Sequence, residues 1–429
     1  MTYQTNKQSI AIIGSGIAGL GLAYNLNDRF KITIYEKSDR LGGHIHSVKV
    51  DEKNNPFYID VGFMVFNKIT YPNFCSLIDD LKVEIYPSSM SFSVNYRPLN
   101  LEWNGAGINK LFSQRKNILN FAYWSFLCEL NKFNNNAKFV LNNENSEYKT
   151  IDQFIKYFNY SENFLNWYLI PIASAIWSIN PKQVLEFPIK TIYQFFYNHG
   201  FLGLNTHFQW YTIKNSTNNY LEKLLSNISA DFYTKINIES IEIENKKVKI
   251  NFDKGESQYF DYCVVATHAD TALSLLKKPT SLEKRLLTSF AYEKNLVTVH
   301  NQSLVMPKLK NTWAAWNWRI DKINNKNYYS THYWVNKLQN IPSKDNYFVS
   351  LNADHLIKNT NKLYEITMSH PQYTVNSLQA QESIDSINKQ SLDQKIFFTG
   401  SYFKYGFHED AYTSGLNLSK NLNRVPNHV

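Results

Sequence analysis

Cysteine and long apolar runs are scarce in this chain of 429 residues. Its three cysteines, Cys75, Cys128 and Cys263, are far apart and lie among apolar residues, so we expect buried free thiols rather than a disulfide framework. The most apolar stretch, 118–130, is interrupted by polar residues and is too short to span a bilayer. Residues 1–8 are polar and lack the apolar core of a signal peptide. We therefore expect a cytoplasmic protein.

Dense charge is also missing. The net charge is +9, spread thinly along the chain, without the basic runs that are typical of nucleic-acid binding. We expect no nucleic-acid partner. A solvated basic surface is the simpler interpretation, and a weak peripheral attraction to anionic membranes or carboxylate substrates is the alternative. No His, Asp, Glu or Cys group has the spacing of metal ligands, so no metal site is expected. The oligomeric state does not follow from the sequence.

With only 15 glycines in the chain, a glycine cluster directly after the apolar residues 9–13 is conspicuous. A triplet at this spacing would arise by chance in about 2% of chains of this composition. A buried strand would lead into a tight turn at Gly14, Gly16 would let the backbone approach a pyrophosphate, and Gly19 would let the next helix pack on the strand. The predicted turn consists of Gly14, Ser15, Gly16, Ala18 and Gly19.

A second apolar stretch, 31–35, ends at Glu36. A carboxylate at the end of the second strand of such a unit accepts hydrogen bonds from a ribose hydroxyl. The turn and Glu36 together predict a dinucleotide site in an α/β fold of the Rossmann type.

The nucleotide-binding unit is expected to be assembled from separated segments. Strand-like patterns recur near 232–266 and 396–398, and a helical pattern closes the chain at 414–422. Between them, 105–200 reads as mostly helical, and 291–370 alternates as in an antiparallel sheet. We predict a nucleotide-binding domain of residues 1–100, 205–290 and 385–429, interleaved with an α+β substrate domain of residues 101–204 and 291–384.

The stretch after Glu36 resembles FAD-dependent oxidoreductases of the amine oxidase and phytoene desaturase class. Members carry an acidic residue, an arginine and a glycine pair in this order, here Glu36, Arg40, Gly42 and Gly43. The class usually has an arginine after the pair, where this chain has His44. The resemblance implies that FAD is the cofactor and that the glycine pair approaches its pyrophosphate.

Further motifs are similar to a narrower bacterial group of predicted NAD/FAD-binding proteins, related to polyenoic fatty acid isomerases. They lie at 60–67 (with Gly62), 175–178, 313–318, 333–339 and 406–415. The group typically has a glycine pair before the serine of its middle segment, where this chain has Lys214, Asn215 and Ser216.

The resemblance also implies roles near the flavin. A short strand at Ile238 would clamp the adenine through its main chain. Gly400 would allow a close approach to the ring, and the helix entered at Asp410 would direct its N-terminal amides toward the ring and stabilise negative charge there. No catalytic residue can be assigned, and His408 is the candidate for a polar group near the ring. A structural role for 408–410 is the simpler interpretation.

Aromatic residues make up 15% of the chain, and several fall in the predicted substrate domain. They either pack in the core or line an apolar cavity, as in related enzymes. The set consists of Trp167, Tyr168, Ile172, Ile176, Trp177, Trp313, Trp316, Trp318, Tyr333 and Trp334.

Three functions follow as hypotheses. The first is an FAD-dependent oxidoreductase that abstracts a hydride from an apolar substrate, an unsaturated fatty acyl chain, with a desaturase, oxidase or isomerase outcome. The second is a flavin amine oxidase, which often has paired tyrosines at the flavin and a lysine near its N5; Tyr402 and Tyr405 are available. The third is a non-catalytic lipid-binding or escort protein on the same scaffold.

Overall fold

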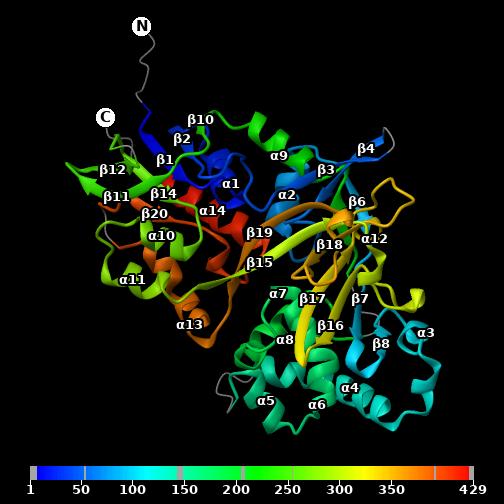
Figure 1. Cartoon of the computed structure of the whole chain (residues 1–429). Coiled ribbons are helices and arrows are strands. Elements are labelled where there is room, and N and C mark those ends of the chain that lie inside the picture. The colour runs from blue at the N-terminus through cyan, green and yellow to red at the C-terminus, as the bar shows by residue number, and fades with distance from the viewer. Residues whose placement is uncertain are drawn as a thin grey trace.

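A five-stranded parallel sheet joins strands from the two ends and the middle of the chain (Figure 1). The computed structural model describes residues 7–52, 55–142, 148–203, 208–253, 255–390 and 393–424. The strand order is β10 (Ala230–Tyr233), β2 (Lys31–Tyr35), β1 (Ser9–Ile13), β14 (Tyr262–Val265) and β20 (Ile396–Phe398). The strands predicted at 9–13, 31–35 and 396–398 are confirmed with these bounds.

The side chains of β1 alternate between two hydrophobic cores. Ile10 and Ile12 belong to the core that contains helices α1 (Ile17–Leu26) and α14 (His408–Leu422). Ala11 and Ile13 face the opposite core, which includes a three-stranded antiparallel sheet. That sheet consists of β11 (Ile238–Glu244), β12 (Lys247–Phe252) and β13 (Ser257–Phe260). Because both faces are covered, the strands of the parallel sheet are continuously apolar.

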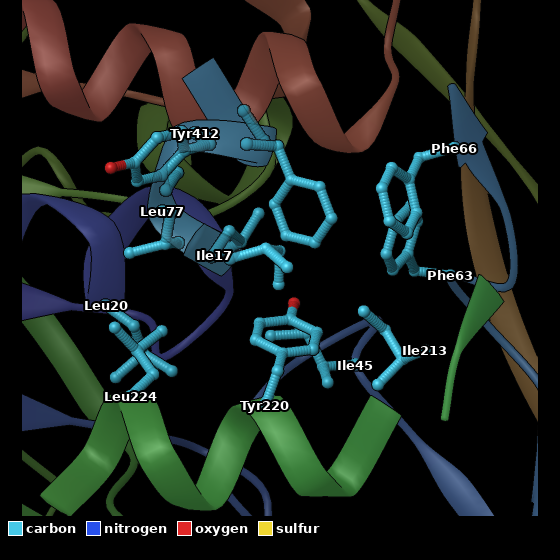
Figure 2. Close-up of a cluster of buried hydrophobic side chains, with 14 of the residues drawn as sticks. Ile17, Leu20, Ile45, Phe63, Phe66, Leu77, Ile213, Tyr220, Leu224 and Tyr412 are labelled. Atoms are coloured by element: carbon cyan, nitrogen blue, oxygen red, sulfur yellow. The ribbon is translucent and has the colours of Figure 1, made fainter. Parts of the chain in front are cut away.

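Helices α1 and α14 cross in contact, although they come from opposite ends of the chain. A Cβ at Gly21 would lie 2.5 Å from the Tyr412 ring, and a Cβ at Gly415 would lie 2.5 Å from the Ala18 carbonyl oxygen. Figure 2 shows this core, with Tyr412 above α1 and Tyr220 reaching in from helix α9 (Thr217–Ser226). Glycine at both crossing points therefore sets the distance between the two helices.

Helix α14 begins at His408, six residues before the helical pattern at 414–422 and two before the entry at Asp410 that the resemblance implies. The Asp410 carboxylate accepts hydrogen bonds from the backbone N–H groups of Tyr405 (3.1 Å) and Phe407 (3.0 Å). Asp410, at the third position of the helix, thus reaches back to the N-cap residue Phe407, which fixes the loop and starts the helix at the next residue. The prediction missed it because the apolar periodicity alone begins later.

A seven-stranded sheet forms the centre of the second half of the fold. Its order is β19 (Lys362–Gln372), β15 (Ala291–His300), β18 (Phe348–Leu351), β17 (Lys326–Trp334), β16 (Trp316–Ile323), β7 (Phe92–Tyr96) and β8 (Leu101–Asn104). The antiparallel sheet predicted for 291–370 is confirmed. The pair of β7 and β16 is parallel, and β7 comes from inside the range 1–100 predicted for the nucleotide-binding domain.

Helices below this sheet confirm the helical prediction for 105–200 (Figure 1). They are α3 (Ile108–Leu111), α4 (Phe121–Asn142), α5 (Ile151–Tyr157), α6 (Glu162–Phe164), α7 (Ile170–Trp177) and α8 (Ile189–Asn198). Across the described ranges, no helix combines the length and apolarity needed to cross a bilayer. The expectation of three buried thiols is wrong for Cys128, which is exposed on α4, while Cys75 is half-buried and Cys263 is buried.

Smaller elements complete the fold. The strands are β3 (Ser47–Glu52), β4 (Asn55–Asp60), β5 (Phe66–Asn67), β6 (Ile85–Ser88) and β9 (Trp210–Ile213). The helices are α2 (Pro72–Asp80), α10 (Ala269–Leu275), α11 (Ser281–Leu287), α12 (Val335–Leu338) and α13 (Val375–Ser383). The two-domain division stays a prediction, and its boundary at 204/205 falls outside the described residues.

Candidate cofactor and substrate site

A cavity of about 1690 Å³ opens at the carboxyl ends of the parallel strands. Residues one or two positions after the ends of β1, β2, β14 and β20 line it, which is where open α/β sheets bind ligands. Its volume exceeds the ~300–1,000 Å³ of pockets for drug-sized ligands, so there is room for a dinucleotide and a second molecule. The predicted site residues that line it are Gly14, Ser15, Gly16, Ala18, Glu36, Arg40, Gly42, Gly43, Gly62, Ile238, Gly400 and His408.

The glycine turn after β1 leaves open space at one position only. Gly14 has φ +104°, and its N–H donates to the Tyr35 carbonyl oxygen at 2.8 Å. A Cβ on Gly14 would lie 2.7 Å from the Ala266 carbonyl oxygen, whereas a Cβ on Gly16 would meet nothing within 4 Å. Gly16 therefore faces the cavity, at the N-terminus of α1. The first amides of a helix have no carbonyl partner within it and can bind an anion.

The Glu36 carboxylate is fixed beside this turn. Oε2 accepts hydrogen bonds from the backbone N–H (3.0 Å) and hydroxyl (2.7 Å) of Ser15, and Oε1 accepts from those of Ser38. Burial alone would raise the Glu36 pKa, but these hydrogen bonds outweigh it and lower the pKa. The carboxylate is therefore ionised at neutral pH and has acceptor capacity left for a ribose hydroxyl.

Arg40 and the glycine pair Gly42–Gly43 form the part of the cavity wall that packs against the glycine turn. The Arg40 guanidinium donates to the carbonyl oxygens of Gly43 (2.8 Å) and Ile45 (3.3 Å), so it braces this loop. A Cβ on Gly43 would lie 3.0 Å from the Gly16 Cα, which shows that the two glycine motifs lie against each other. At Gly62, a Cβ would lie 2.1 Å from the His44 carbonyl oxygen, so glycine is required for that close approach.

Two predicted site residues, Gly19 and Asp410, do not line the cavity. A Cβ on Gly19 would lie 2.2 Å from the Gly14 carbonyl oxygen, so Gly19 packs α1 onto its strand, as its predicted role requires. Asp410 is buried among the backbone amides that it caps, and desolvation raises its pKa to about 7.

The side chains of 408–410 diverge, as the structural interpretation of this motif predicts. Glu409 accepts hydrogen bonds from the backbone N–H groups of Asn73 and Phe74 and so caps helix α2, while Asp410 caps its own loop. The His408 ring stacks on Phe63 with centroids 3.8 Å apart. Over the described part of the chain, no group of His, Cys, Asp or Glu residues has the geometry of a metal site.

His408 is a neutral side chain at the cavity wall. Its Nε2 lies 2.6 Å from the Tyr220 hydroxyl oxygen. Desolvation, with a smaller contribution from His44, lowers the His408 pKa to about 3. The ring therefore carries no charge at neutral pH.

Sequence reasoning missed a group of three more cavity histidines, His44, His268 and His370. The His44 ring centroid lies 6.1 Å from that of His268 and 5.8 Å from that of His370. Desolvation and mutual repulsion lower the pKa of His44 to about 3 and that of His370 to about 4. The only sequence signal was His44, at the position where the resembling class has arginine.

The inner half of the cavity is apolar. From the predicted aromatic and aliphatic set, the lining includes Tyr168, Ile172, Ile176, Trp177, Trp316 and Tyr333. The other members pack in the hydrophobic cores instead, namely Trp167, Trp313, Trp318 and Trp334. Sequence reasoning missed further apolar residues of the whole cavity lining, among them Leu111, Phe126, Leu130, Phe195 and, at the surface, Ile108. Trp316 and Trp318 are two residues apart on β16 and therefore share a face of the strand, but Trp316 lines the cavity whereas Trp318 packs in the core farther along the strand.

Several buried polar groups of the lining lack a protein partner. Among the described residues, these include the Tyr402 hydroxyl and the indole N–H groups of Trp177 and Trp316. Unpaired buried donors call for a ligand or water. These unpaired groups fit a bound flavin dinucleotide. So do the open space at Gly16, the ionised Glu36 carboxylate and the close contact between the glycine turn and the glycine pair.

Comparisons with known proteins agree with this geometry. A profile of the family described as flavin containing amine oxidoreductase matches residues 17–301. A curated relative, probable polyamine oxidase 4 from Arabidopsis thaliana, is 51% identical over 49 residues, which are 11% of this chain and 10% of that protein.

Solved structures are similar over nearly the whole chain. A CLA-producing fatty acid isomerase from P. acnes is 13% identical with a TM-score of 0.66, covering 97% of this chain and 99% of its own. Cyclohexylamine oxidase from Brevibacterium oxydans IH-35A is 15% identical with a TM-score of 0.67, covering 97% and 100%. Putrescine oxidase bound to putrescine is 9% identical with a TM-score of 0.68, covering 97% and 99%. At such identities, these likenesses show the fold.

Proposed function

The chain belongs to the family of flavin-containing amine oxidoreductases, and from that premise we propose that its substrate is an unsaturated fatty acyl chain. FAD is the cofactor, and the protein is an FAD-dependent oxidoreductase. In the proposed reaction a hydride leaves an activated carbon of the acyl chain. Its return to another carbon of the same chain gives an isomerase. Its transfer to an acceptor, with loss of a proton from the neighbouring carbon, gives a desaturase or oxidase.

The observation that carries the proposal is the lining of the inner cavity. Among the described lining residues, the acidic side chains are Glu36 and Glu239, and both lie with the nucleotide-binding turn. An amine cation deeper in the cavity would lack a carboxylate partner, and unpaired burial of a polar group costs about 1–3 kcal/mol or more. An acyl chain gains about 0.8 kcal/mol per buried methylene, so ten methylenes contribute on the order of 8 kcal/mol before ordering costs.

The cofactor-binding roles are part of the proposal. The α1 amides at Gly16 bind the pyrophosphate, Glu36 binds the ribose, and the main chain at Ile238 holds the adenine. When bound, FAD supplies the acceptor for two electrons. Gly400, whose N–H is held by the Ser414 hydroxyl at 3.0 Å, lets the chain approach the ring closely.

The N-terminus of α14 and the uncharged His408 ring lie at the proposed position of the flavin ring. The first turn of α14 faces the cavity at His408 and Ala411, so its partial positive charge stabilises negative charge that develops on the ring. Tyr220 and Phe63 fix the His408 imidazole, which makes His408 a positioning residue for the ring or the substrate.

Within the described part of the chain, the lysine of the amine oxidase arrangement has no counterpart in the inner cavity. Lys37 is the lysine among the described lining residues, and it lies next to Glu36. The hypothesis of a non-catalytic escort protein is also weaker, because the glycines at 14, 16, 42, 43, 62 and 400 are all present and line one cavity.

Two variants of α7 test the substrate class. Ile176 lines the cavity and Ile170 does not, although both are half-buried on the same helix. Ile176→Glu places a carboxylate in the channel, so linoleate should bind the holoprotein at least tenfold more weakly, measured by perturbation of flavin absorbance. Ile170→Glu, the control, should bind linoleate normally. Tight putrescine binding by the parent protein, without any response to fatty acids, would contradict the proposal.

A further inference from the structure

Large apolar side chains are exposed together where α3, the 3₁₀ turn η2 (Arg115–Leu119) and the start of α4 follow one another. The exposed fraction is 72% for Ile108, 88% for Leu119 and 91% for Phe121. Ile118 and Trp124 are each 47% exposed. We call these five side chains the 108–124 patch. Exposed apolar groups at this density mark an interaction surface, because soluble proteins rarely expose large apolar side chains in contiguous groups.

Positive charge surrounds the patch. Residues 105–128 contain Lys110, Arg115 and Lys116 and no Asp or Glu. Turn η6 (Lys310–Thr312) lies against α3, and the Asn311 side chain donates to the Ser113 hydroxyl at 2.8 Å. Lys310 of this turn is exposed. A surface with apolar residues between cations complements an anionic interface with an apolar interior.

The cavity reaches the surface at the same place. Its lining runs from Phe126 and Leu130 past Leu111 to Ile108, which belongs to the patch. Residues 105–108 line the cavity and are exposed. Figure 1 shows α3 and α4 at the lower right, far from both chain termini. Ile108 therefore joins the patch to this exposed stretch of the cavity lining, residues 105–108, which we call the channel mouth.

We propose that the 108–124 patch docks the protein on the surface of an anionic phospholipid bilayer, with the channel mouth facing the lipid. Phe121 and Trp124 lie one helical turn apart at the start of α4. The amphipathic Trp124 ring favours the interface between head groups and acyl chains, and Phe121 adds apolar area to be buried there. Lys110, Arg115 and Lys116 bind the lipid phosphates. An acyl chain then enters the cavity at Ile108 without crossing water.

The proposal goes beyond the proposed function, since docking does not require that an acyl chain be the substrate. Its test uses the holoprotein and vesicles of phosphatidylcholine, with or without 30% phosphatidylglycerol as an experimental choice. Cys128, exposed one turn beyond Trp124 on α4, takes an environment-sensitive fluorophore. We expect a blue shift and co-sedimentation with the anionic vesicles, both weakened by 0.5 M salt.

Matched variants locate the contact. The double variant Leu119→Ser with Phe121→Ser changes two side chains outside the cavity lining and should bind anionic vesicles at least tenfold more weakly. Ile243→Ser, which removes a 55% exposed side chain on β11 at the other end of the molecule, should bind as the parent does. Lys116→Glu should weaken binding to anionic vesicles but not to neutral ones.

Three results would overturn the proposal. They are absence of vesicle binding by the parent, equal binding by the double variant, and a solution dimer that the double variant abolishes, which would assign the patch to a second copy of the chain. Linoleate titration of the double variant keeps the two proposals apart. A double variant that has lost docking but perturbs the flavin absorbance normally supports both proposals. Docking by the parent protein, without any response of its flavin to fatty acids, leaves docking standing and contradicts the substrate proposal.

Discussion

Gly16 is the residue whose substitution most directly tests the cofactor position. Its φ of −70° suits any residue, and nothing lies within 4 Å of its Cβ position, so the fold tolerates a side chain there. Gly16→Val should fill the space proposed for the pyrophosphate and abolish FAD binding, and Gly16→Ala should weaken it to a lesser degree. The flavin content of purified protein and circular dichroism provide the measurements. Full flavin occupancy in folded Gly16→Val would refute the assignment.

Ser216 shows where this chain departs from the group that it resembles. Its φ is 117° and its ψ is 164°, a region occupied almost only by glycine, and Asn215 before it has φ +65°. Strain of this kind costs about 1–3 kcal/mol. The Ser216 side chain makes no cap hydrogen bond, so Ser216→Gly should raise the free energy of unfolding by about 1–3 kcal/mol.

Urea unfolding measures this gain. Ser226→Gly, at the other end of α9, is the matched control and should lower the free energy of unfolding by about 0.5–1 kcal/mol, because glycine is unfavourable in a helix. A destabilised Ser216→Gly protein would show that this serine contributes more than its backbone costs.

The crossing of α1 and α14 couples the two ends of the chain to the cofactor site. Gly415→Ala would place a methyl group 2.5 Å from the carbonyl oxygen of Ala18. Ala18 belongs to α1, whose N-terminus faces the cavity at Gly16. The helices must separate, so we expect destabilisation of about 1–3 kcal/mol, the usual cost of overpacking a core, and weaker FAD binding. Thermal unfolding and FAD titration provide the measurements. Asn417→Ala, at an exposed position of α14, should leave both unchanged, and an unaffected Gly415→Ala protein would contradict this packing.

The elements differ in how far the sequence predicts them. The strands at 9–13, 31–35 and 396–398 are predicted to the residue, because each is a short apolar run ended by a turn. The start of α14 is not, because it depends on the Asp410 carboxylate folding back onto the loop before it. The pattern at β16 also misleads, since the spacing places Trp316 and Trp318 on one face of the strand but does not tell how far along that face the cavity extends.

The histidine group could not be predicted at all. His44, His268 and His370 come from three distant segments, and only the assembled fold brings them to one wall. The glycine turn, by contrast, is local, so its position at the cavity follows from the sequence.

Buried neutral histidines give the whole molecule a predicted pH dependence. Desolvation lowers the pKa of His300 to about 3, of His199 to about 4 and of His44 to about 3, against about 6.5 in an unfolded chain. Below pH 6.5 the unfolded chain therefore binds more protons than the folded one, so stability falls as the pH decreases toward 4. Urea unfolding of the holoprotein at pH 7.5, 6 and 5 should show a steady loss. Equal stability at pH 7.5 and 5 would contradict the neutral burial of these rings.

A single cavity that holds FAD at one end and an acyl chain at the other is the central claim. Anaerobic mixing of the oxidised holoprotein with linoleate, followed by flavin absorbance and by analysis of double-bond positions in the product, tests it most directly. The account predicts flavin bleaching, transient or lasting, together with a shifted or additional double bond, and no bleaching by putrescine or cyclohexylamine. Bleaching by the amines alone, with every fatty acid recovered unchanged, would contradict it.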